Sequence, residues 1–171
     1  MRRFVPESDA QESRGHKSPS LVDHPMNPSK AIGLCALTTL VALYIVGALS
    51  NGVLRHFVQT LPLCFAIVMG FRNREIAKWS SLPCSIIWLV LMALIWLFLL
   101  GWANVITGHF SPVEVILTTV VGAASLVGLI AGLRWRTSLT WGKGLSTSVV
   151  FAALQIAALR LSFLPLIARD Q

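Results

Sequence analysis

Five apolar stretches of about 20 residues each follow Lys30, and few charged side chains interrupt them. A helix rises about 1.5 Å per residue, so about 20 residues cross a hydrocarbon core of about 30 Å. The stretches cover about residues 31–50, 53–71, 82–103, 113–133 and 145–167. This pattern predicts an all-α integral membrane protein, built as a bundle of about five transmembrane helices.

The composition excludes an ordinary water-soluble domain. Hydrophobic residues make up 55% of the 171-residue chain and charged residues only 12%. Soluble domains carry about a quarter charged residues, because their surfaces face water. Most of this chain must therefore face lipid or other apolar helices.

The third stretch predicts a span clearly, whereas the second is ambiguous. The third contains the unbroken apolar run 86–100, with Trp79 and Trp102 outside it at the spacing of two interfacial belts. The second is interrupted by Gln59 and Pro62, so a kinked, short or re-entrant segment is the alternative. A re-entrant second segment would leave four transmembrane helices.

Residues 1–30 differ in kind from the rest of the chain. They contain four prolines, five serines and nine charged residues, and almost nothing that could enter a core. We expect a disordered, polar, cytoplasmic tail. The first span ends in the small residues Ala48 and Ser50, so cleavage before Asn51 as a signal sequence is an alternative that also leaves four helices.

The basic residues predict an orientation. With the N-terminus in the cytoplasm, eleven of the fourteen Lys and Arg residues lie on the inside. These are Arg2, Arg3, Arg14, Lys17, Lys30, Arg72, Arg74, Lys78, Arg134, Arg136 and Lys143. The positive-inside rule therefore favours an inside N-terminus and an outside C-terminus, and the composition is typical of a bacterial inner (plasma) membrane protein. The net charge of +7 is then a topology signal, and we expect no nucleic-acid partner.

Small and weakly polar residues mark two helix-packing seams. In the fourth and fifth stretches they recur on one face, at spacings of three, four and seven residues. They are Gly122, Ser125, Gly128, Gly132, Ser148 and Ser162. We expect these two seams to face each other or the interior of the bundle.

Arg160 is the one clear ionisable residue within a span. Glu114 stands at the start of the fourth stretch, and adjoining seams would bring the two side chains together as an ion pair. The alternative is that Arg160 reaches up to lipid phosphate. Ser111 and Pro112 precede Glu114 in a Ser-Pro-Val-Glu sequence, which predicts a capped helix N-terminus with glutamate at its third position.

The candidate polar cluster on the outer side offers weak support for a ligand site. It comprises Arg160, Glu114, Gln155, Gln59, His56 and His109. His56 and His109 lack a third ligand and a helical i, i+4 spacing, so we expect no metal or cofactor. Cys35, Cys64 and Cys84 match no zinc pattern and are expected to be free, buried thiols.

The sequence contains no catalytic motif, so we predict a non-enzymatic protein. The leading hypothesis is an accessory or complex-forming component that acts through helix contacts, either with copies of itself or with other membrane proteins. The first alternative is a small transporter or channel subunit with a polar path lined by Gln59, Gln155, Arg160 and Glu114. The second is a haem or metal redox enzyme that uses His56 and His109.

Overall fold

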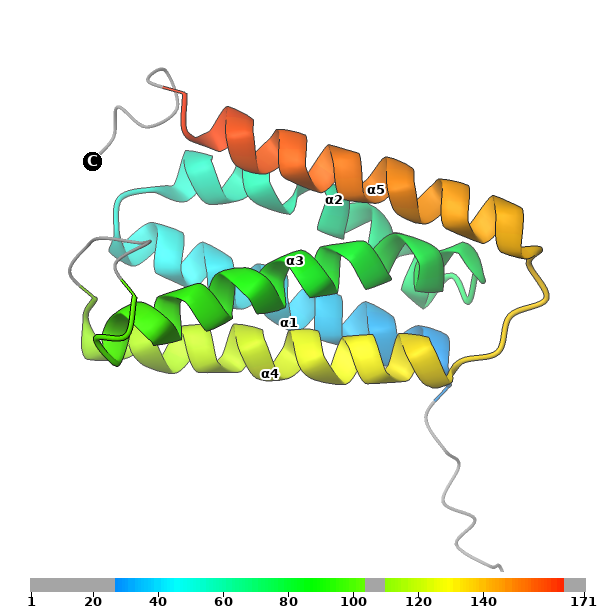
Figure 1. The fold of residues 1–171 in the computed structure, drawn as a ribbon, viewed down its shortest axis with the longest axis horizontal. Helices are drawn as coiled ribbons and strands as arrows, with labels where there is room; N and C mark the ends of the chain where they lie inside the picture. The colour runs from blue at the N-terminus through cyan, green and yellow to red at the C-terminus, as the bar shows by residue number, and fades with distance from the viewer. Residues whose placement is uncertain (1–26, 104–109, 165–171) are drawn as a thin grey trace, which may run out of the picture.

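A computed structural model describes residues 27–103 and 110–164. This part of the chain is all-helical and has five helices, which lie roughly alongside one another (Figure 1). They are α1 (Pro28–Leu49), α2 (Val53–Phe71), α3 (Ile76–Leu99), α4 (Pro112–Arg134) and α5 (Trp141–Ser162). Each is long and apolar enough to cross a bilayer. The predicted all-α fold with five spans is confirmed.

Local sequence explains where the helices begin and end. The Asn27 side chain accepts a hydrogen bond from the Ser29 amide at 3.0 Å, and Pro28 occupies the first helical position of α1. Asn51, Asn73 and Gly101 follow α1, α2 and α3 with positive φ values, which asparagine and glycine tolerate best.

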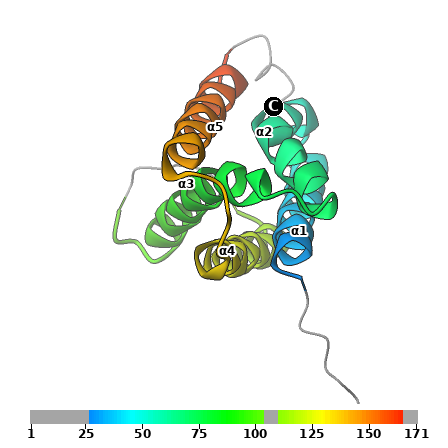
Figure 2. The ribbon, with the colours of Figure 1, turned by 90° about the vertical axis from the view of Figure 1, so that its right-hand side faces the viewer.

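The helix α3 is the centre of the bundle. It contacts all four other helices, with α4 and α1 on one side and α5 and α2 on the other (Figure 2). The helices α1 and α2 also pack against each other, as do α1 and α4, and α2 and α5. No contact joins α4 to α5 within the described chain, because α3 lies between them.

The core consists of apolar side chains at the junctions with α3. One cluster joins α1, α3 and α4, and a second joins α1, α2 and α3. The first contains Ala42, Leu43, Trp88, Met92 and Val121, and the second contains Ala36, Leu63 and Cys84.

The closest helix contact is between α1 and α2. Gly33 and Gly70 meet there, and a Cβ atom added to Gly70 would lie 2.7 Å from the Gly33 Cα. The Ser29 hydroxyl donates a hydrogen bond to the Gly70 carbonyl at 2.9 Å. The sequence analysis missed this crossing, although Ser29 and Gly33, like Ala66 and Gly70, have the small-xxx-small spacing that marks such contacts.

The predicted spans agree with the helices, with differences at their ends. The helix α2 continues through Pro62 from Val53 to Phe71, so it is not a re-entrant segment. The helix α3 begins at Ile76, six residues before the predicted span. Its first turns are weakly polar, so the apolar stretch in the sequence starts later than the helix. Ser80 and Ser81 donate hydrogen bonds there to carbonyls of the preceding turn.

Two predictions about the ends of the chain need correction or lie outside the described part. Of the predicted disordered tail, residues 28–30 are the first turn of α1, since Asn27 and Pro28 start the helix. Residues 1–26 and 165–167 lie outside the described residues.

Trp79 is also not placed as predicted. It is only 9% exposed and covers Gly144 of α5, whereas Trp102 is 77% exposed. Trp79 therefore packs within the bundle and does not form an interfacial belt. Its ring meets the exposed Trp141 edge-on, with centroids 5.8 Å apart.

The outer surface of the bundle is apolar. Large side chains such as Ile116 (63% exposed), Val149 (61%) and Val90 (53%) point away from the other helices. Contiguous apolar surface of this extent is unfavourable in water and suited to lipid. The chain is therefore built as a small multipass membrane protein.

Replacing Gly70 by alanine should destabilise the bundle. The added methyl group would collide with the backbone of α1 and not with a movable side chain, which typically costs about 1–3 kcal/mol. The free energy of unfolding, measured by denaturant titration in detergent, should fall accordingly. Gly142→Ala is the control, since a Cβ atom there meets nothing within 4 Å. Equal stability of the two variants would contradict the close crossing.

Candidate functional site between α2 and α5

A buried hydrogen-bond network connects α2 to α5. The Gln59 side-chain amide donates to the Ser162 hydroxyl at 2.8 Å, and the Gln155 side-chain amide donates to the Gln59 carbonyl at 2.8 Å. The Ser162 hydroxyl donates to the Leu159 carbonyl at 2.7 Å. Gln155 and Ser162 are fully buried and Gln59 is 6% exposed. The sequence proposed Gln59 and Gln155 as candidates, and the structure brings them together.

The network contacts α2 at the turn that precedes Pro62. Pro62 has no amide hydrogen and its ring crowds the preceding turn, so the Val58 carbonyl lacks its usual donor within the helix. In a bilayer, no water is available to satisfy such carbonyls, and a neighbouring helix usually does so. Gln155 supplies such a donor to α2 at the neighbouring Gln59 carbonyl.

Aromatic contacts close this seam at both ends. At one end the Arg55 guanidinium lies 4.2 Å from the centre of the Phe163 ring, a favourable cation–π distance. At the other end the rings of Phe65 and Phe151 are 4.8 Å apart. We call the polar groups between them, Arg55, Gln59, Gln155 and Ser162, the α2–α5 seam.

Two polar atoms of the α2–α5 seam have no hydrogen-bond partner among the residues that the structure describes. They are Oε1 of Gln155 and Nε of Arg55, both buried. A buried acceptor or donor without a partner costs about 1–3 kcal/mol. The seam could therefore take one additional donor at Gln155 and one additional acceptor at Arg55.

His56 lies at the same end of the bundle as Arg55, which we call the distal end. Its Nδ1 is 2.9 Å from the Gly52 carbonyl, so Nδ1 carries the proton and Nε2 is the free nitrogen. The ring packs against Gly47 of α1.

The described residues include no group of three His, Cys, Asp or Glu side chains suited to a metal ion. His109 lies outside the described residues. Cys35, Cys64 and Cys84 are free thiols, and only Cys84 is fully buried.

The predicted ion pair between Glu114 and Arg160 is wrong. The helices α4 and α5 do not touch, because α3 separates them. Glu114 instead completes the predicted capping box: its carboxylate accepts from the Ser111 amide at 2.7 Å, while the Ser111 hydroxyl accepts from the Glu114 amide at 3.3 Å. Arg160 is exposed on the outer side of α5.

Of the two arrangements expected for the packing seams, the structure shows the second: they face the interior of the bundle and not each other. The α4 seam packs against α1 and α3, where Gly128 meets Cys35 and Ser85, and Gly132 meets Leu82. The α5 seam packs against α3 and α2. The remaining predicted positions are Ser125, buried; Gly122, beside Met92; Ser148, which donates to the Trp79 carbonyl at 2.8 Å; and Ser162, in the α2–α5 seam.

Basic side chains gather at the end of the bundle opposite the distal end, which we call the basic end. Lys30, Arg72, Arg74, Lys78, Arg134, Arg136 and Lys143 lie there, at the start of α1 and around the α2–α3 and α4–α5 connections. Figure 1 shows these three segments on the same side.

Hydrogen bonds join the two connections at the basic end. The Lys78 ammonium donates to the Trp135 carbonyl at 2.6 Å, and the Ser138 hydroxyl donates to the Glu75 carboxylate. Hydrogen bonds from the Ser138 backbone and side chain lower the pKa of Glu75, so this exposed carboxyl stays ionised at neutral pH. The sequence analysis gave no signal for these contacts, because they depend on how the loops meet.

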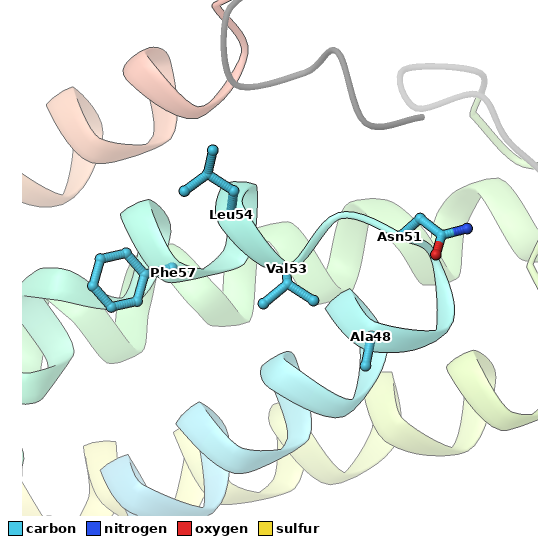
Figure 3. Close-up of a pocket in the computed structure, with 5 residues that line it drawn as sticks. All are labelled: Ala48, Asn51, Val53, Leu54 and Phe57. Atoms are coloured by element: carbon cyan, nitrogen blue, oxygen red, sulfur yellow. The ribbon is translucent and has the colours of Figure 1, made fainter.

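An open groove lies beside the α1–α2 turn at the distal end. It is lined by Ala48, Asn51, Val53, Leu54 and Phe57 (Figure 3). These side chains point in different directions and do not converge on a common point. Asn51 is the only polar one, so the groove offers little chemistry compared with the α2–α5 seam.

Comparisons of the chain with known protein families, with curated proteins and with solved structures found no match.

Ser162→Ala should weaken the α2–α5 seam by leaving the Gln59 amide buried without its acceptor. We expect a loss of about 1 kcal/mol in the free energy of unfolding, the scale of hydrogen bonds between membrane helices. In a Gln59→Leu background the same substitution should cost little, because the donor is already gone. Ser146→Ala, on the exposed side of α5, is the control. Identical costs of Ser162→Ala in both backgrounds would show that the two side chains are not coupled.

Proposed function

We propose that this protein is a non-enzymatic multipass component that assembles with other membrane proteins, or with copies of itself, through the outward face of α5. Composition supports a membrane role, and the α2–α5 seam contains amides, a hydroxyl and a guanidinium but no carboxylate, histidine or thiol. Such groups are suited to hold helices together more than to acid–base chemistry.

The exposed side of α5 carries this proposal. Ser146, Ala153, Ala157 and Arg160 all lie there, on the side of the helix opposite Gln155. Small residues gain nothing from lipid but allow another helix to approach closely. An arginine inside a span is costly unless it finds a partner or reaches the headgroups. Among the described helices, α5 contacts α2 and α3 and neither α1 nor α4, so we take this side to be available to a further helix.

A photo-crosslinking amino acid tests this face. Placed at Ala157, it should give a discrete adduct of higher mass in native membranes, which mass spectrometry can identify. Placed at Leu126, which is 49% exposed on α4, it should give none, because that position faces lipid. The absence of an adduct at Ala157, or equal adducts at both positions, would refute assembly through α5.

The alternative of a transporter or channel subunit draws support from the two unpartnered atoms of the α2–α5 seam. The path proposed from sequence is not assembled within one chain, since Arg160 and Glu114 lie away from Gln59 and Gln155. A path along the seam would require α2 and α5 to separate, because Gln155 is fully buried. Solute flux in proteoliposomes that Gln155→Leu abolishes would favour this alternative.

We further propose that the basic end faces the cytoplasm of a bacterial inner membrane, with the N-terminus inside and the C-terminus outside. The gathering of seven basic side chains at that end supports it. In a variant without the three native cysteines, Asn51→Cys should react with an impermeant maleimide on intact cells, and Arg74→Cys should not. Labelling of Arg74→Cys alone would reverse the orientation.

A further inference from the structure

An internal cavity lies where α1, α2, α3 and α4 meet. It has about 10 Å³ of space, and only α5 contributes nothing to its lining. Thr39, Trp88 and Ser125 of its lining lie near the middle of their helices. The cavity is therefore near the midplane of a bilayer that the helices cross.

The lining of this cavity is unusually polar for such a depth. The hydroxyls of Thr39, Ser85 and Ser125 line it, and all three residues are buried. Within the described chain, no hydrogen bond joins any of these three hydroxyls to another protein group. The Ser81 hydroxyl, in contrast, donates to the Lys78 carbonyl. Ser85 Oγ faces Gly128, where an added Cβ would lie 3.6 Å from it.

The Trp88 indole gives the second, independent indication of a ligand. Its side chain is 3% exposed and lines the cavity, yet its Nε1 has no hydrogen-bond partner in residues 27–103 and 110–164. A buried N–H without an acceptor costs about 1–3 kcal/mol. An acceptor placed against Nε1 would remove this cost.

We propose that the cavity binds one water molecule, which accepts a hydrogen bond from Trp88 and donates to hydroxyls on α1, α3 and α4. A buried water needs roughly 10–15 Å³ and two to four polar partners, and the cavity supplies both. No charged side chain lines it, so a neutral molecule fits better than an ion. The water joins three helices at the centre of the bundle, at a site independent of the proposed assembly through α5.

The test is the contact between water and the Trp88 indole in the full-length protein. The protein is labelled with ¹⁵N-tryptophan in lipid nanodiscs, and Trp88→Phe identifies the resonance. A nuclear Overhauser cross-peak between water and the Trp88 Nε1–H should be present. Its absence would show a dry cavity and overturn the proposal.

Two glycine variants give a matched comparison. Gly128→Ala places a methyl group in contact with Ser85 Oγ and Cys35, so it should displace the water and abolish the cross-peak. Gly122→Ala adds the same methyl on the same helix beside Met92 only, and should keep the cross-peak. A cross-peak that survives unchanged in Gly128→Ala would overturn the proposal.

A second variant covers the case in which Gly128→Ala does not fold. Thr39→Val keeps the volume of the side chain and removes one hydroxyl from the lining. It should shift the Trp88 Nε1–H resonance and weaken the cross-peak. If neither changes, Thr39 does not hold a water in this cavity and the proposed site is wrong.

Discussion

Close approach of helices is the constraint on which this structure depends. In a bilayer, apolar side chains gain little by exchanging contacts with lipid for contacts with one another. Helices therefore associate where their backbones come near enough for dispersion contacts and hydrogen bonds. The Gly33–Gly70 crossing of α1 and α2 is the clearest case, and the Ser29 hydroxyl adds a bond to the backbone there. At the basic end, Gly144 likewise makes room for the Trp79 ring. Small residues therefore mark where these helices come close to one another.

Residue periodicity was enough to predict much of the fold. The apolar stretches predicted five spans, and Ser111 and Glu114 predicted the start of α4, because both signals are local along the chain. The neighbours of each helix were not predictable in this way. A small-residue stripe shows which face of α4 is buried, but it does not show whether α1, α3 or α5 covers it.

The incorrect prediction of the ion pair shows what helix periodicity can and cannot predict. Glu114 is spaced by four residues from Thr118 and so belongs to the buried stripe of α4, whereas Arg160 is five residues from the buried Gln155, about 140° away around α5. Glu114 therefore lies on the buried side of its helix and Arg160 away from the buried side of its own helix. The residue spacing in the sequence indicates this difference. What it could not show was that α3 would lie between α4 and α5, since every helix here is apolar enough to occupy the centre.

Polar groups inside the bundle are distributed by the same requirement for partners. The α2–α5 seam joins amides to a hydroxyl and to the Gln59 backbone carbonyl near Pro62, and the central cavity is lined by Thr39, Ser85, Ser125 and the Trp88 side chain. The hydrogen bonds of the seam join α2 to α5, and the cavity lies where four helices meet. Arg160 differs, because it points outward from the bundle and the described helices provide no acidic partner for it. A role beyond packing is therefore to be sought at the outward face of α5, where the proposed assembly would bring a partner to Arg160.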